Sequence, residues 1–197
     1  MSGHSKWKQI KHQKGAADIK RGQLFSKLLK AITIAAKSDP NPQFNPRLRT
    51  TILKAKEGNV PADNIERAIR HASEKSEALE ELLLEGYGPG SAAMIVTAIT
   101  DNSNRTIPEL KKIFSDHEAK WASPGSVCWS FTPPTGLPSE AGQRSGLSAQ
   151  SEFAPDGTEW QAKFPQVISA EDKEKLDALT RALEEHSDVQ RVFTNAA

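Results

Sequence analysis

Cationic side chains and one aromatic ring alternate over the first fifteen residues of the chain. The residues of this segment that could contact a polyanion are His4, Ser5, Lys6, Trp7, Lys8, Lys11, His12 and Lys14. Lysine side chains bind nucleic acid by releasing the counterions of its phosphates. The ring of Trp7 could stack on an unpaired base, or it could pack on neighbouring helices and anchor the segment. The pattern therefore predicts a nucleic-acid contact and leaves both roles of Trp7 open.

Basic residues are concentrated in the N-terminal third of the sequence. Up to His71 there are 15 Lys and Arg residues against 5 Asp and Glu residues, whereas the rest of the chain has 11 against 20. A basic segment attracts polyanions, and nucleic acid is the commonest polyanion in a cell. The alternative is that these lysines only cover solvated helix faces. On the charge argument we add Lys20, Arg21, Arg47 and Arg49 to the predicted contact residues.

The sequence carries no residue pattern that is typical of an enzyme or a metal site. Its five histidines form no H-E-x-x-H pair, and a single cysteine cannot supply a Cys-x-x-Cys zinc site. That cysteine, Cys128, is expected to be a small buried apolar residue of a strand. The glycine-rich run at 86–90 lacks the Lys-Ser/Thr of a P-loop and is expected to be a hairpin turn. We predict no catalytic residue, no metal and no cofactor.

A polar run at 101–106 separates a predicted strand from a predicted helix. It contains Asp101, Asn102, Asn104 and Arg105. Asp, Asn and Ser side chains are favoured helix caps, and polar helix N-termini also bind phosphate. We expect capping and keep a secondary contact surface as a second hypothesis.

The composition also limits where the protein works. No run approaches the roughly 18 apolar residues of a membrane span, and the N-terminus lacks the apolar stretch of a signal peptide. One cysteine excludes an intrachain disulfide, which fits a reducing compartment. We expect a cytoplasmic protein with no membrane partner and no small-molecule substrate; its oligomeric state stays open.

Residues 1–76 are expected to form a basic arm followed by a three-helix bundle. The arm covers 1–15, where apolar residues show no period, and the first helix covers 16–37. Pro46 should begin the second helix, with Leu48, Ile52 and Leu53 inward, and Pro61 should begin the third.

Residues 77–132 and 159–197 are expected to form an α/β domain, and 133–158 a flexible linker rich in Pro, Gly and Ser. The predicted strands are 82–87, 92–100, 127–131, 160–167 and 189–193, and the predicted helices are 105–117 and 170–186. Without the first strand, this order is that of the ferredoxin-like split βαβ unit. The predicted fold class is therefore α+β, a helical bundle followed by a ferredoxin-like domain.

Several ordered motifs resemble one protein family. They are Gly3-His4-Ser5-Lys6-Trp7 with Ile10-Lys11-His12, Asn45-Pro46-Arg47-Leu48-Arg49, Asn59-Val60-Pro61 with Asp63-Asn64-Ile65-Glu66-Arg67-Ala68-Ile69, Glu85-Gly86-Tyr87-Gly88-Pro89-Gly90, Thr100-Asp101-Asn102 with Asn104-Arg105-Thr106, Gly125-Ser126-Val127 with Phe131, and Asp188-Val189-Gln190 with Val192. Together they resemble the YebC/PmpR family over residues 1–131 and, less closely, over 170–195.

This resemblance implies an N-terminal helical domain, ferredoxin-like α/β domains and a role in gene expression. It implies a DNA-binding transcriptional regulator. The alternative is a translational activator that binds RNA or the ribosome, like the related mitochondrial activator of cytochrome oxidase synthesis. Two departures stand out: the domain that the family inserts between the strands near Phe131 and Trp160 is replaced by the predicted linker, and Trp121 is bulky for a normally glycine-rich segment.

Overall fold

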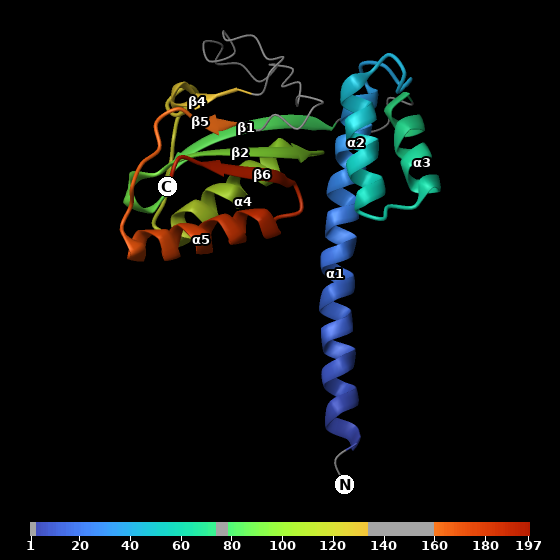
Figure 1. Ribbon diagram of the computed structural model, residues 1–197, viewed down its shortest axis with the longest axis horizontal. Coiled ribbons are helices and arrows are strands. Elements are labelled where there is room, and N and C mark those ends of the chain that lie inside the picture. Colours follow the sequence, from blue (N-terminus) through green and yellow to red (C-terminus); the bar gives the residue numbers. More distant parts are fainter. Residues whose placement is uncertain (1–2, 74–78, 134–159) are drawn as a thin grey trace.

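A computed structural model describes residues 3–73, 79–133 and 160–197 of the chain, with side chains from residue 18 onward. Two parts lie side by side in it (Figure 1). The helical part consists of α1 (Gly3–Ala36), α2 (Pro46–Glu57) and α3 (Ala62–Ser73). The α/β part contains an antiparallel sheet and two helices on one of its faces. The α+β class predicted from the sequence is confirmed.

The longest element is α1, which has 34 residues and begins at Gly3. The prediction of an irregular arm over 1–15 is therefore wrong, because the first helix continues through it. Lys, Gln and Ala favour helix, and no proline stands before Pro40. Figure 1 shows this half of the helix extending away from the rest of the molecule.

Local capping signals define the second and third helices. The Asn45 side chain accepts a hydrogen bond from the Leu48 amide at 2.9 Å, and Pro46 follows as the first helical residue. The core of the helical part contains Ile32, Ala35, Ala36, Leu48, Ala55, Val60, Ile65 and Ala68. The inward prediction is right for Leu48 but wrong for Leu53, which is 55% exposed.

The main sheet of the α/β part has the strand order β3-β1-β2-β6. Its strands are β1 (Glu80–Tyr87), β2 (Ala93–Thr100), β3 (Lys120–Trp121) and β6 (Val189–Thr194). All neighbours in the sheet are antiparallel. The helices α4 (Ser103–Asp116) and α5 (Ala170–Glu185) pack on one face over Met94 and Val96 of β2, and Leu179 of α5 is buried in the same core. No helix in the described part of the chain is long and apolar enough to cross a membrane.

The strands of this sheet differ from those of the predicted split βαβ unit. The strand that was set aside, β1, lies in the middle of the sheet beside β2. The predicted strands at 127–131 and 160–167 are reduced to a 3-10 turn, η2 (Cys128–Ser130), and to β4 (Phe131–Thr132) and β5 (Gln161–Ala162). These two short strands pair only with each other. The predicted linker at 133–158 lies outside the described residues except for Pro133.

Side-chain bonding explains why the 127–131 strand does not form. The buried Glu85 carboxylate accepts hydrogen bonds from the amides of Gly125, Val127 and Cys128 at 2.5–2.9 Å. These amides are therefore committed to a side chain and cannot pair with a neighbouring strand. A buried carboxylate requires such partners, because burial without them costs several kcal/mol.

The predicted hairpin between β1 and β2 is confirmed. A short 3-10 turn, η1 (Pro89–Ser91), joins the two strands, and Gly90 adopts a φ of 65°. At Gly86 in β1 a Cβ atom would stand 2.3 Å from Cε1 of Phe114. Trp121 packs edge-on against the same phenyl ring, with 5.6 Å between the ring centroids. The phenyl ring of Phe114 therefore lies against the Gly86 backbone, and Trp121 packs on the edge of that ring.

Candidate nucleic-acid interface

The predicted N-terminal contact residues all lie on one continuous helix. His4, Ser5, Lys6, Trp7, Lys8, Lys11, His12 and Lys14 belong to the first half of α1. Lys20 and Arg21 follow on the next turns and are exposed. Arg21 pairs with Asp18, with 2.7 Å between Nη2 and Oδ1. At 1.5 Å per residue, the helix spaces the backbone positions of these residues regularly along one straight axis.

The two predicted arginines of α2 lie in different surroundings. Arg49 is exposed, and its guanidinium donates to the carbonyls of Pro42 and Gln43 at 3.3 and 3.4 Å. Arg47 forms an ion pair with Glu81 of β1, and their side chains are only 17% and 9% exposed. Arg49 therefore extends the exposed basic surface, whereas Arg47 joins the helical part to the α/β part.

The two parts are also joined by Lys27 and Lys30 of α1 and by Lys37, which directly follows this helix. These contacts were not predicted from the sequence. Nζ of Lys30 lies 2.5 Å from Oδ1 of Asp188, in the turn between α5 and β6. Lys27 donates to the carbonyl of Glu184 at the end of α5. Lys37 donates to the carbonyl of Leu79 at 2.8 Å. The only sequence signal is the position of Lys27, Lys30 and Lys37 beside the apolar stripe of the helix, and it does not reveal the partners.

The contacts of Lys27, Lys30, Lys37 and Arg47 with the α/β part form the junction between the two parts. Asp188 lies at the centre of this junction, and its side chain is 1% exposed. Besides Lys30, its carboxylate accepts from the Thr106 hydroxyl at 2.7 Å and from Nη2 of Arg105 at 3.0 Å. Burial raises the pKa of Asp188, but the hydrogen bonds from Lys30, Thr106 and Arg105 lower it by more, so the pKa lies well below its usual range. The carboxylate therefore stays ionised and holds α1 and α4 together.

The polar run at 101–106 is part of the same junction. The Asn102 side chain caps α4 by accepting from the Arg105 amide at 3.2 Å, so the predicted capping is confirmed. Arg105 bridges Asp101, at 2.9 Å, and Asp188. Asn104 is exposed. Arg105, which the second hypothesis placed on a secondary contact surface, is thus engaged by two carboxylates.

One histidine has a defined role at the edge of the junction. Nδ1 of His186 accepts from the Asp188 amide at 3.1 Å, which places the ring proton on Nε2. Nε2 lies 3.0 Å from Oε2 of Glu109. Glu109 lies in α4 one turn beyond Arg105. Through these two contacts His186 connects the Asp188 backbone to the Glu109 carboxylate, so Glu109 also belongs to the junction.

Cys128 shows none of the surroundings of a nucleophile. It lies in η2 rather than in a strand, and it is half-buried. Burial raises the pKa of its thiol, and the neighbouring Glu85 carboxylate raises it further. Among residues 3–73, 79–133 and 160–197, no group of three or more His, Cys, Asp and Glu side chains is placed to hold a metal ion.

Comparison with known proteins identifies the family. A family model described as the TACO1/YebC protein N-terminal domain matches residues 5–75, and one described as the TACO1/YebC second and third domain matches residues 79–135. The chain belongs to the TACO1/YebC family. The resemblance inferred from the motifs is thereby confirmed.

Curated relatives of this TACO1/YebC chain are named as regulators. A "probable transcriptional regulatory protein" of Desulfosudis oleivorans is 39% identical over 238 positions, which cover 100% of this chain and 97% of the relative. One of Treponema denticola with the same name is 54% identical over 134 positions, covering 66% of this chain and 54% of the relative. A family-level role as a regulatory protein follows from these names.

A solved structure shares the fold of this TACO1/YebC chain. The crystal structure of a conserved hypothetical protein from Aquifex aeolicus superposes with a TM-score of 0.75 at 33% identity. The match covers 91% of each chain. The arrangement of helical and α/β parts is therefore one that a relative adopts in a crystal.

Proposed function

We propose that this regulatory protein binds nucleic acid through the first half of α1 and the adjoining exposed cations, and that it acts as a DNA-binding transcriptional regulator. The observation that carries the proposal is the basic helix itself: a 34-residue α1 extends beyond the rest of the molecule and carries the predicted contact residues on its protruding half. Lysines on such a helix neutralise phosphates wherever the backbone of the nucleic acid runs.

The cations of the helical part fall into two sets, those bound at the junction and those exposed to solvent, and this division supports the assignment. Lys27, Lys30, Lys37 and Arg47 are bound to groups of the α/β part. Lys20, Arg21 and Arg49 are exposed to solvent. The basic charge of the helical part is thus partly structural, and the contact surface that we propose consists of the protruding half of α1 together with Lys20, Arg21 and Arg49.

The charge distribution favours initial docking through the helical part. Residues after His71 carry 20 Asp and Glu against 11 Lys and Arg, so the phosphates of a polyanion are attracted to the helical part and repelled from the acidic faces of the α/β part. We propose no enzymatic activity, since the polar groups of the junction neutralise one another and leave no nucleophile beside a base. The names of the relatives describe regulators and not enzymes.

We also propose that residues 133–158 take the place of a domain that relatives carry. The alignment with the Desulfosudis protein extends over 238 positions although this chain has 197 residues, so the relative has several dozen residues without a counterpart here. Binding through α1 does not depend on such a domain.

A binding assay with matched variants tests the function. The test variant replaces Lys6, Lys8, Lys11 and Lys14 by Ala, and the control replaces Lys112, Lys173, Lys175 and Arg181, which are exposed on α4 and α5, by Ala. Both lose four positive charges. We expect the test variant to lose duplex binding by at least tenfold and the control to keep it. Equal losses would mean that only net charge matters, and the α1 proposal would fail.

RNA or ribosome binding is the second candidate, favoured by the tendency of basic helices to bind structured RNA. Crosslinking in cells followed by sequencing separates the two. Recovery of discrete promoter DNA supports the transcriptional role, whereas recovery of ribosomal RNA that is lost in the α1 variant supports translational activation.

A further inference from the structure

A pocket of about 490 Å³ lies at the end of β1 and β2 that is far from α1. Tyr87, Trp129 and Phe164 supply its aromatic lining, and Ser91, Gln166 and Asn195 supply polar groups. None of the described residues that line it is charged, although the surrounding α/β part is acidic. Its size lies in the range of pockets that take one small molecule or one group of a larger ligand.

Two of the aromatic side chains are held by the same carbonyl oxygen. The Ser126 carbonyl accepts from the Tyr87 hydroxyl at 3.1 Å and from Nε1 of Trp129 at 2.8 Å. The loop that carries this carbonyl is fixed in turn by the Glu85 carboxylate. The indole is therefore fixed in orientation before any ligand arrives.

The opposite wall of the pocket is fixed by the C-terminal residues. The Asn195 side chain donates to the Phe164 carbonyl at 3.1 Å and accepts from the Ala93 amide at 2.8 Å. The Gln166 side chain donates to the Gly90 carbonyl at 2.7 Å. Main-chain and side-chain bonds thus tie the Phe164 segment to the sheet, so both walls are preorganised.

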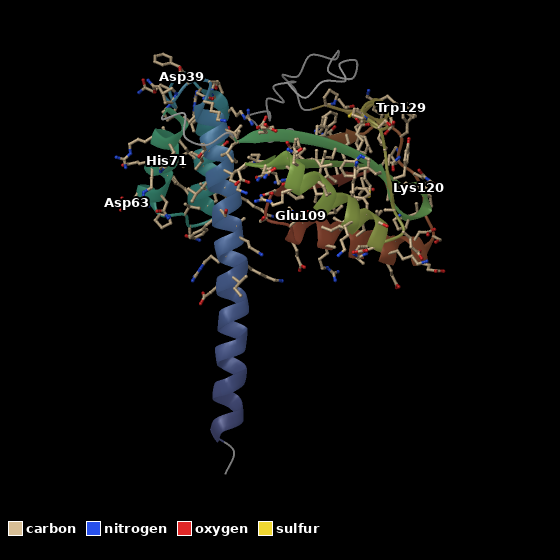
Figure 2. All side chains as sticks on the ribbon, turned by 180° about the vertical axis from the view of Figure 1, so that it is seen from behind. Asp39, Asp63, His71, Glu109, Lys120 and Trp129 are labelled. Atoms are coloured by element: carbon tan, nitrogen blue, oxygen red, sulfur yellow. The ribbon has the colours of Figure 1, made fainter. Side chains whose placement is uncertain are left out.

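Despite this fixation the aromatic rings remain open to solvent. Trp129 is 64% exposed and Phe164 is 58% exposed. Their ring centroids lie 5.8 Å apart with an interplanar angle of 46°. Figure 2 shows Trp129 on the side of the sheet opposite the two helices. An exposed indole that is held by a hydrogen bond beside a second exposed ring does not serve the core, and such rings are typical of a binding surface.

We infer that this pocket binds an unpaired nucleobase, as a second contact of the nucleic acid that α1 engages. A base offers a flat ring for stacking and a polar edge for hydrogen bonds, which match the exposed indole and the uncharged Ser91 and Gln166. The exposed Lys163, whose Nζ lies 3.5 Å from the Trp129 carbonyl, can meet a flanking phosphate. A duplex is too wide to enter a pocket of this size, so the base must be unpaired.

This inference rests on the proposed function, and two oligonucleotides separate the two claims. The first is a hairpin with a paired stem and an unpaired loop, made as DNA and as RNA. The second is a fully paired duplex of the same stem. Trp129→Ala should weaken binding of the hairpin roughly tenfold to hundredfold, which is the range for loss of one stacked base. Its affinity for the duplex should not change.

Two controls accompany this variant. Phe44→Ala removes a ring that is 75% exposed on the helical part and should change neither affinity. Trp129→Phe keeps a stacking ring and should restore most of the hairpin binding. Because Trp129 is exposed, its replacement opens no cavity, and thermal unfolding should confirm an intact fold.

The outcomes distinguish the claims. Equal hairpin affinity for the unaltered protein and Trp129→Ala, with a loss only in the α1 lysine variant, overturns the pocket and leaves the proposed function standing. Binding of neither oligonucleotide by the unaltered protein overturns both. Competition by a free nucleoside monophosphate at the affinity of the hairpin would overturn the assignment to nucleic acid, because the ligand would then be a mononucleotide.

Discussion

Lys30 of α1 lies 2.5 Å from the buried carboxylate of Asp188, in the turn between α5 and β6. The two residues are 158 positions apart in the chain, and their contact joins the helical part to the α/β part. Arg105 and Thr106 bind the same carboxylate from α4. One acidic side chain therefore binds donors from both parts and helps to orient the basic helix relative to the sheet.

Replacement of Asp188 should destabilise the protein strongly. Asp188→Ala removes the acceptor of four side-chain donors and leaves Lys30, which is only 22% exposed, without its counter-charge. Loss of one partner of a buried pair typically costs about 3–5 kcal/mol; the partial exposure of Lys30 and Arg105 places the expected loss near the lower end. Urea unfolding measures it. Asp177→Ala, at an exposed position of α5, should stay within about 0.5 kcal/mol.

Acid should destabilise the protein through the same residue. The pKa of Asp188 is lowered in the folded state, so its stabilising contribution is complete above the usual Asp pKa of about 4 and is lost as the pH falls below that value. The free energy of unfolding should decline as the pH is lowered from about 5. In Asp188→Asn this decline should be shallower. Parallel pH profiles of the two proteins would contradict the assignment.

Glu85 should be required for the loop that carries the pocket. Its carboxylate accepts from three amides, at Gly125, Val127 and Cys128. Glu85→Ala leaves these donors without an acceptor, the buried Val127 amide among them, and we expect a loss of about 3 kcal/mol, since bonds to charged groups contribute roughly 1.5–3 kcal/mol each without adding fully. Chemical unfolding checks this. Glu80→Ala, which alters an exposed carboxylate of the same strand, should have little effect.

Two glycine-to-alanine changes should have opposite effects. At Gly86 the new methyl group would stand 2.3 Å from Phe114 and 3.0 Å from the Lys120 carbonyl, so Gly86→Ala should cost about 1–3 kcal/mol or more. At Gly22, in the exposed part of α1, no atom lies within 4 Å of the new methyl group. Gly22→Ala should instead raise the helicity and stabilise α1 by about 0.5–1 kcal/mol. Circular dichroism and thermal melts decide both; stabilisation by Gly86→Ala would refute the packing described for β1 and α4.

Binding by α1 should depend steeply on salt. Engagement of ~6–10 phosphates would reduce the affinity by about 10³–10⁵ between roughly 50 and 200 mM salt. Replacement of Lys6, Lys8, Lys11 and Lys14 should reduce the slope of log K against log salt by up to about 0.9 per lost contact. A nearly flat salt response of the unaltered protein would exclude phosphate contacts as the basis of binding.

Local patterns in the sequence determined most of the secondary structure and the family. The cap at Asn45, the proline at Pro46 and the apolar periods of α3, α4 and α5 act within a few residues, so they can be recognised without knowledge of the fold. The charge asymmetry and the ordered motifs are likewise properties of the chain itself.

The tertiary structure alone decided which segments become strands of the main sheet and which cations remain exposed. The segment after Ser126 has strand-like residues, but Glu85 binds its amides and removes them from pairing. Lys30 is a lysine beside the apolar stripe of α1, and nothing in its sequence surroundings distinguishes it from the exposed Lys20. In the structure, however, it is bound to Asp188 near the other end of the chain. Contacts between residues more than a hundred positions apart leave no local signal, because their energy arises only when the two parts pack together.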